Sequence, residues 1–110
     1  MTAAEMAEIR HATERGRILE TLAADYSSEM TSMSSLIAAL DLMGVSCSVE
    51  SMAFHLQYLV DSEYIKVWRN RDIPGRRPPG AASDVRFLRL QPKGLQLRDG
   101  HIKADPMVRF

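Results

Sequence analysis

The sequence of 110 residues predicts an α+β fold, with a three-helix core first and a β-hairpin after it. Two stretches have apolar residues at the spacing of an amphipathic helix, and a short turn containing Gly44 separates them. Two later stretches are rich in β-branched and aromatic residues, and a segment rich in proline and glycine separates these. This order of elements is the pattern of a winged helix-turn-helix, with a hairpin of two or three strands and a short C-terminal helical turn.

Residues 2–26 are predicted to form the first helix, because Thr2 is a suitable N-cap and good helix formers follow it. The second half has one apolar stripe, but Met6 and Ile9 lie on another side of the helix. Either the helix bends between its halves, or the early turns bury their own face. A second protomer is the simplest partner for that face, and a frayed N-terminus is the alternative. Residues 1–16 are therefore treated as an N-terminal helical extension.

The next two helices are predicted at residues 33–43 and 48–62. Gly44 is placed to end the first of them, and Ser48 is placed to cap the second, which corresponds to the recognition helix of this fold class. One face of this central helix is apolar and is expected to face the core. The opposite face is expected to carry Glu50, Ser51, Phe54, His55, Gln57, Tyr58 and Asp61.

The hairpin is predicted from two strands at residues 64–71 and 84–91. Residues 72–83 between them contain three of the five prolines, two glycines and two adjacent arginines, which excludes regular structure and indicates a long wing loop. Residues 92–100 begin with proline and end with glycine, as a short helical turn does. Residues 101–110 are interpreted as a tail that lies on its own domain or on a partner.

The composition indicates one globular domain spanning residues 1–110. Hydrophobic residues make up 45% of the chain and charged residues 25%, which are ordinary values for such a domain. No apolar run is long enough to cross a membrane, and the N-terminus lacks the features of a signal peptide. Cys47 is the only cysteine, so we predict neither an internal disulfide nor a metal site, and no cofactor. A reducing cytoplasm is the expected location.

Charge is distributed unevenly along the chain, although its net value is zero. Residues 1–65 hold three basic and ten acidic side chains, a net charge of −7. Residues 66–110 hold eleven basic and four acidic side chains, a net charge of +7. Such asymmetry indicates a polyanion or an acidic surface as a partner. The alternative is that the two halves neutralise each other in the folded chain.

Several short motifs carry a resemblance to known proteins. The sequence Gln91-Pro92-Lys93-Gly94-Leu95, together with residues 17–68, is similar to winged-helix domains in general. More specific are Arg17-Ile18-Leu19, Leu22-Ala23, Tyr26-Ser27, Gly44-Val45 and the ending Gly100-His101-Ile102-Lys103-Ala104-Asp105-Pro106-Met107-Val108. These resemble a family of small proteins of Mu-like transposable phages and prophages. The resemblance implies the fold and a phage protein in a bacterial host cytoplasm. The function of that family is uncertain, so no catalytic residues are implied.

DNA binding with a regulatory purpose is the predicted function. Double-stranded DNA is the expected partner, read by the start of the central helix and held by the basic wing. The predicted DNA-binding residues are Ser48, Ser51, His55, Arg69, Arg71, Arg76 and Arg77, with further phosphate contacts from Lys66, Arg86 and Arg89. Because the central helix has no lysine or arginine, the wing has to neutralise the phosphates, and weak binding is expected. A solvated basic surface is the alternative.

The alternative function is a winged-helix module that binds a phage or host protein and no DNA. Phe54 and Tyr58 are one helical turn apart, which suits a protein interface, and Met6 and Ile9 suit a homodimer. Coverage of the two aromatic side chains by the first helix or the C-terminal tail is the purely structural explanation. No Ser-His-Asp, Cys-His or paired-carboxylate arrangement is visible, so the chain is not predicted to be an enzyme.

Overall fold

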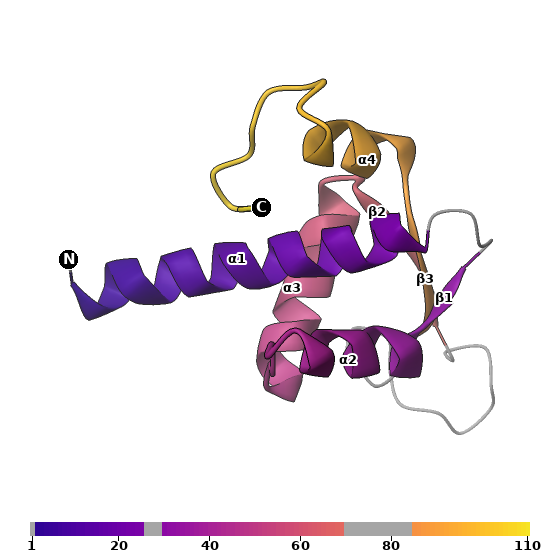
Figure 1. Cartoon of the computed structure of the whole chain (residues 1–110), viewed down its shortest axis with the longest axis horizontal. Coiled ribbons are helices and arrows are strands. Elements are labelled where there is room, and N and C mark those ends of the chain that lie inside the picture. Colours follow the sequence, from indigo (N-terminus) through magenta and orange to yellow (C-terminus); the bar gives the residue numbers. More distant parts are fainter. Residues whose placement is uncertain (1, 26–29, 70–84) are drawn as a thin grey trace.

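The computed structural model describes residues 2–25, 30–69 and 85–110. These residues form an α+β arrangement of four helices and one three-stranded antiparallel sheet (Figure 1). In chain order the elements are α1 (Ala3–Ala24), β1 (Thr31–Ser32), α2 (Met33–Leu42), α3 (Val49–Asp61), β2 (Ile65–Arg69), β3 (Val85–Leu90) and α4 (Pro92–Arg98). The predicted wing, residues 72–83, lies outside the described residues. None of the described helices combines the length and apolar character that a membrane crossing requires.

Helix α1 begins as the sequence predicts and runs without a break to residue 24. The hydroxyl oxygen of Thr2 accepts the N–H of Glu5 at 3.1 Å, so Thr2 is the N-cap. The helix does not bend between its halves (Figure 1). Gly16 is instead required for packing, because a Cβ at this position would overlap the backbone carbonyl oxygen of Arg109.

The α2–turn–α3 unit confirms the predicted caps. Ser32 and Ser48 cap the two helices, and the hydroxyl oxygen of Ser48 accepts the N–H of Ser51 at 3.1 Å. Gly44 adopts a positive φ of 76° directly after α2. The N–H of Val45 then donates to the carbonyl of Leu40 at 2.8 Å, which closes the helix and starts the turn.

The sheet has the strand order β1-β3-β2, with both pairs antiparallel. The sequence does not predict β1, which is only two residues long and pairs Thr31 with Leu88. Strands β2 and β3 confirm the two predicted hairpin strands, with slightly shorter bounds. Their register is interrupted by a β-bulge between Trp68 and Arg69.

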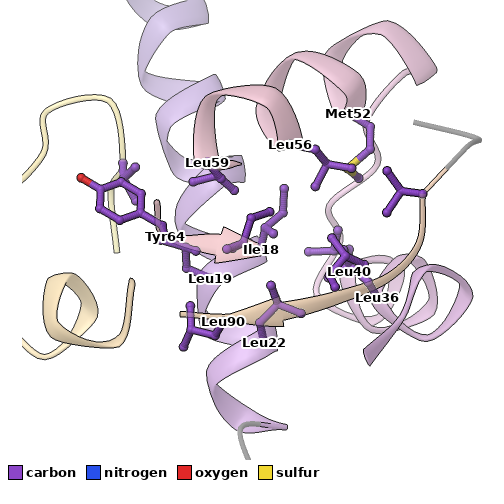
Figure 2. Packing of buried hydrophobic residues seen from close by; sticks show 14 of the residues in the cluster. Ile18, Leu19, Leu22, Leu36, Leu40, Met52, Leu56, Leu59, Tyr64 and Leu90 are labelled. Atoms are coloured by element: carbon purple, nitrogen blue, oxygen red, sulfur yellow. The ribbon is translucent and has the colours of Figure 1, made fainter. Parts of the chain in front are cut away.

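The hydrophobic core lies between the three long helices and one face of the sheet (Figure 2). Each helix contributes part of the apolar stripe that its periodicity predicts, but Ile37, Met43 and Val49, which share the predicted core faces, are exposed at the edge of the core. The buried members include Ile18, Leu19 and Leu22 of α1, Leu36 and Leu40 of α2, Met52, Leu56 and Leu59 of α3, and Leu88 and Leu90 of β3. The core therefore fixes α3 against both α1 and the sheet.

The C-terminal tail lies on its own domain, which was one of the two predicted positions. Asp105 accepts hydrogen bonds from the hydroxyls of Tyr58, at 2.7 Å, and Tyr64, at 2.8 Å. Arg15 of α1 donates to the carbonyl of Met107 at 2.9 Å. The N–H of Arg109 donates to the carbonyl of Ala12 at 3.0 Å. These contacts join the tail to both α1 and α3.

Candidate nucleic-acid interface

The exposed start of α3 has few groups that suit a phosphate backbone. Ser48 is exposed, but its hydroxyl already accepts the N–H of Ser51 as the helix cap. Gln57 donates to Asp61 at 2.9 Å within the same helix. No lysine or arginine occurs between residues 18 and 65, whereas seven acidic residues do. The α2–α3 unit therefore presents a surface that repels a polyanion.

His55 does not belong to the exposed face of α3, so its predicted role in reading bases is wrong. Its side chain is buried, with 0% exposure, and its Nε2–H donates to Oε1 of Glu14 on α1 at 3.0 Å. Burial lowers the pKa of His55, so the imidazole is neutral near pH 7. A signal for burial was present in the sequence, since Met52 and Leu59 lie one helical turn before and after His55.

The two aromatic residues of α3 that the sequence assigned to a protein interface differ in exposure. Tyr58 is half-buried, and the guanidinium of Arg15 lies 5.0 Å from its ring centroid. The first helix and the tail thus both cover Tyr58, which is the purely structural explanation given above. Phe54 remains 63% exposed, with Arg15 5.6 Å from its ring centroid.

Met6 and Ile9, the two residues proposed for a homodimer interface, also differ in solvent exposure. Met6 is 59% exposed on the first turns of α1. Ile9 is half-buried and lines a shallow groove together with Pro106 and Met107 of the tail. The tail therefore covers part of the apolar surface that we assigned to a second protomer, and the homodimer stays a prediction.

The outer face of the β2–β3 hairpin collects basic and aromatic side chains. Ile65, Val85, Leu88 and Leu90 point into the core, and alternation along each strand directs their neighbours outward. The bulge adds Arg86 to the outward set. We call this set the hairpin face; its members are Lys66, Trp68, Arg86, Phe87 and Arg89. The helices lie on the opposite side of the sheet (Figure 1).

The register pairs like residues with like across this face. Lys66 lies directly opposite Arg89, and Trp68 lies directly opposite Phe87. Two cations in opposite positions repel each other, so this arrangement is unfavourable for the isolated sheet. None of the three cations forms an ion pair with another described residue. The Nζ of Lys66 lies 5.2 Å from the Trp68 ring centroid, which leaves its charge available to an anion.

Only one of the four arginines predicted to bind DNA lies within the described residues. Arg69 ends β2 and is half-buried, and its buried Nη1 has no hydrogen-bond partner among the described residues. Arg71, Arg76 and Arg77 lie outside the described residues, so their predicted contacts stay predictions.

A second surface, apolar and acidic, surrounds the α2–α3 turn. A cleft of about 610 Å³ lies between α2, the start of α3 and the start of β3, where Arg86 and Phe87 of the hairpin face also line it. Around the cleft and the turn, large apolar side chains are exposed; they are Ile37, Leu42, Met43 and Val49, and Leu42 is 91% exposed. The exposed side chains of Asp41 and Glu50 flank them. This surface suits an apolar partner with basic side chains rather than a nucleic acid.

Comparisons with protein-family models, with curated proteins and with solved structures find no match to this chain. The function is therefore inferred from the residues on its surfaces.

Sequence reasoning missed Trp68 and Phe87 as members of a candidate site. The alternation in residues 65–69 and 85–90 contains the signal, because basic and aromatic residues share one face of each strand. What the sequence lacks is the register, since the connecting segment is too long to fix which residues lie opposite each other. The like-with-like pairing became visible only with the paired strands.

Proposed function

We propose that the chain is a winged helix-turn-helix protein that binds nucleic acid through the hairpin face, and that α3 does not act as a recognition helix. The observation that carries the proposal is the pairing of Lys66 with Arg89 beside the pairing of Trp68 with Phe87. The order of elements, with two capped helices around a tight turn and then a hairpin, supports the fold assignment.

Nucleic-acid binding is favoured because the hairpin combines the two groups that such binding uses. The described strands hold four cations and no acidic residue, which attracts a phosphate backbone. Two aromatic side chains in opposite positions, Trp68 and Phe87, provide π-faces on which unpaired bases stack. Single-stranded nucleic acid is therefore the proposed ligand, with Lys66, Arg86 and Arg89 at the phosphates and Trp68 and Phe87 at the bases.

The fluorescence of Trp68 provides a direct test, because it is the only tryptophan in the chain. Titration with a single-stranded oligonucleotide is expected to quench this fluorescence as a base stacks on the ring. Affinity is expected to fall as salt rises. Loss of two phosphate contacts in an Arg86→Gln/Arg89→Gln variant is expected to reduce the slope of log affinity against log salt by about 1.4, at about 0.7 per contact.

The matched control is an Arg98→Gln/Lys103→Gln variant, which removes the same charge from exposed positions of α4 and the tail. This control is expected to keep the slope of the wild type. Equal loss in both double variants would mean that only net charge matters. Tighter binding of duplex than of single-stranded oligonucleotide, with loss in an Arg76→Ala/Arg77→Ala variant, would return the interface to the wing predicted from the sequence.

A second candidate function is favoured by the apolar cleft at the α2–α3 turn. The chain would act as an adaptor whose cleft takes an apolar peptide segment with basic flanks, since Asp41 and Glu50 border the apolar residues. A phage or host protein would supply that segment. The phage context and a regulatory role rest on the sequence resemblance alone.

A leucine- and lysine-based amphipathic peptide tests this second candidate. The wild type is expected to bind it in fluorescence anisotropy, and an Ile37→Lys/Val49→Lys variant is expected to lose binding. Met6→Lys, which changes an exposed apolar residue elsewhere, serves as the control. Binding that is equal in all three proteins would contradict a role for the cleft.

A further inference from the structure

A group of metal-ligating side chains lies between α1 and α3, away from the hairpin face. His11 and Glu14 are three residues apart on α1, and His55 reaches them from the middle of α3. One potential ligand atom from each of these three residues lies within 4.8 Å of the other two. The two imidazole rings are 5.3 Å apart between centroids, with planes inclined by 60°. Nδ1 of His11 and Nε2 of His55 both contact Oε1 of Glu14.

Two of the distances within this group are close to the spacing of ligands around a small divalent cation. Oε1 of Glu14 lies 3.0 Å from Nε2 of His55 and 3.2 Å from Nδ1 of His11. Tetrahedral zinc with ligand bonds of 2.0–2.1 Å separates its ligand atoms by about 3.3 Å. A cation bound to all three atoms would thus replace the two hydrogen bonds that Glu14 accepts.

The three side chains of the group differ in solvent exposure, so one side of the group is covered and the other is open to solvent. The side chain of His55 is 1% exposed and that of Glu14 is 13% exposed, whereas that of His11 is 34% exposed. A cation would therefore enter past His11. Arg15 is a positively charged neighbour of Glu14 in the sequence, and its guanidinium donates to the carbonyl of Met107 and lies over the Tyr58 ring.

We propose that His11, Glu14 and His55 form a site for a borderline-soft divalent cation such as Zn²⁺, with water as the fourth ligand. The chemistry of the donor set selects this class, because two imidazoles and one carboxylate suit zinc and its neighbours rather than magnesium or calcium. A bound cation would join α1 directly to the middle of α3. Metal occupancy would thus fix the position of α3 relative to α1. The sequence-based prediction of no metal site considered only thiols, and the histidine and glutamate ligands come from two separate helices.

Titration of the chelator-treated full chain with Co²⁺ tests the proposal. The expected result is saturable binding of one equivalent, with the strong visible absorption of four-coordinate Co²⁺. Zn²⁺ is expected to displace Co²⁺ and to raise the thermal midpoint of the wild type.

His11→Gln is the decisive variant, because His11 is the least buried of the three ligands and its replacement leaves the core intact. We expect it to weaken Co²⁺ binding more than tenfold, since even the loss of an outer-shell partner of a metal ligand costs ten- to a hundredfold. His101→Gln, which changes the only other histidine outside the group, is expected to bind as the wild type does. The absence of saturable binding, unchanged affinity in His11→Gln, or loss in His101→Gln would overturn the proposal.

Discussion

Replacement of Asp105 by alanine is expected to release the C-terminal tail and to lower the stability of the whole domain. The carboxylate oxygen Oδ2 accepts both the Tyr58 and the Tyr64 hydroxyls, and Oδ1 accepts the N–H of Met107. Tyr64 is buried, so Asp105→Ala leaves its hydroxyl without this acceptor. The substitution therefore removes a junction between the tail, α3 and the start of β2.

The expected loss in the free energy of unfolding follows from the number and kind of hydrogen bonds that Asp105 accepts. A hydrogen bond to a charged acceptor contributes about 1.5–3 kcal/mol. The two tyrosine hydroxyls share one oxygen of a partly exposed carboxylate, so their contributions do not simply add. We expect a loss of about 2–3 kcal/mol in the free energy of unfolding. At roughly 4–8 °C per kcal/mol for a domain near this size, the thermal midpoint would fall by roughly 8–24 °C.

The pH dependence of stability provides an independent test of whether the charge of the Asp105 carboxylate stabilises the fold. Burial by itself would raise the pKa of Asp105, but hydrogen bonds from Tyr58, the N–H of Met107 and Tyr64 outweigh it and hold the pKa below 3.8. A carboxyl group with a lowered folded-state pKa stabilises the fold above its unfolded-state value. This contribution is lost as the pH falls through the folded-state pKa. The difference between wild type and Asp105→Asn is thus expected to be large at pH 7 and small in strong acid.

Urea denaturation of the wild type, Asp105→Ala and Asp105→Asn, measured at pH 7 and in acid, is the assay. Tyr64→Phe is the matched control, because it removes one hydroxyl and keeps the carboxylate and the ring. It is expected to cost less than Asp105→Ala. The reasoning would be refuted if both Asp105 variants unfolded at the same urea concentration as the wild type at pH 7.

Three further substitutions test the packing and the turn. Gly16→Ala is expected to detach the end of the tail, because the new Cβ would overlap the Arg109 carbonyl. Hydrogen exchange of the Arg109 amide, which donates to Ala12, is then expected to become faster. Unchanged exchange would contradict this expectation. Gly44→Ala is expected to cost about 1–2 kcal/mol in thermal or urea unfolding, because only its positive φ opposes a side chain, and Gly44→Asn is expected to cost less. Leu56→Ala is expected to cost about 2–5 kcal/mol, while a change at exposed Leu42 is expected to be nearly neutral; similar costs for both would contradict the assigned core.

The sequence by itself determined the helices, their ends and the hairpin strands. Thr2 and Ser48 are caps because their hydroxyls satisfy backbone N–H groups within three residues, and Gly44 ends α2 because it adopts a positive φ without strain. These are local interactions, so the nearby residues suffice to predict them. The apolar stripes likewise follow from the 3.6-residue period of each helix.

Only the tertiary structure decided which polar side chains are buried and which basic residues meet. His55 is buried because Glu14 provides an acceptor from 41 positions earlier in the chain, and no periodicity within α3 identifies that partner. Tyr58 is half-buried because Asp105 and Arg15 reach it from the tail and from α1. The pairing of Lys66 with Arg89 and of Trp68 with Phe87 depends on a strand register that the long connection leaves open. In each case the deciding contact joins residues far apart in sequence. Met52 and Leu59 indicated that His55 could be buried, but they did not identify the partner that makes its burial possible.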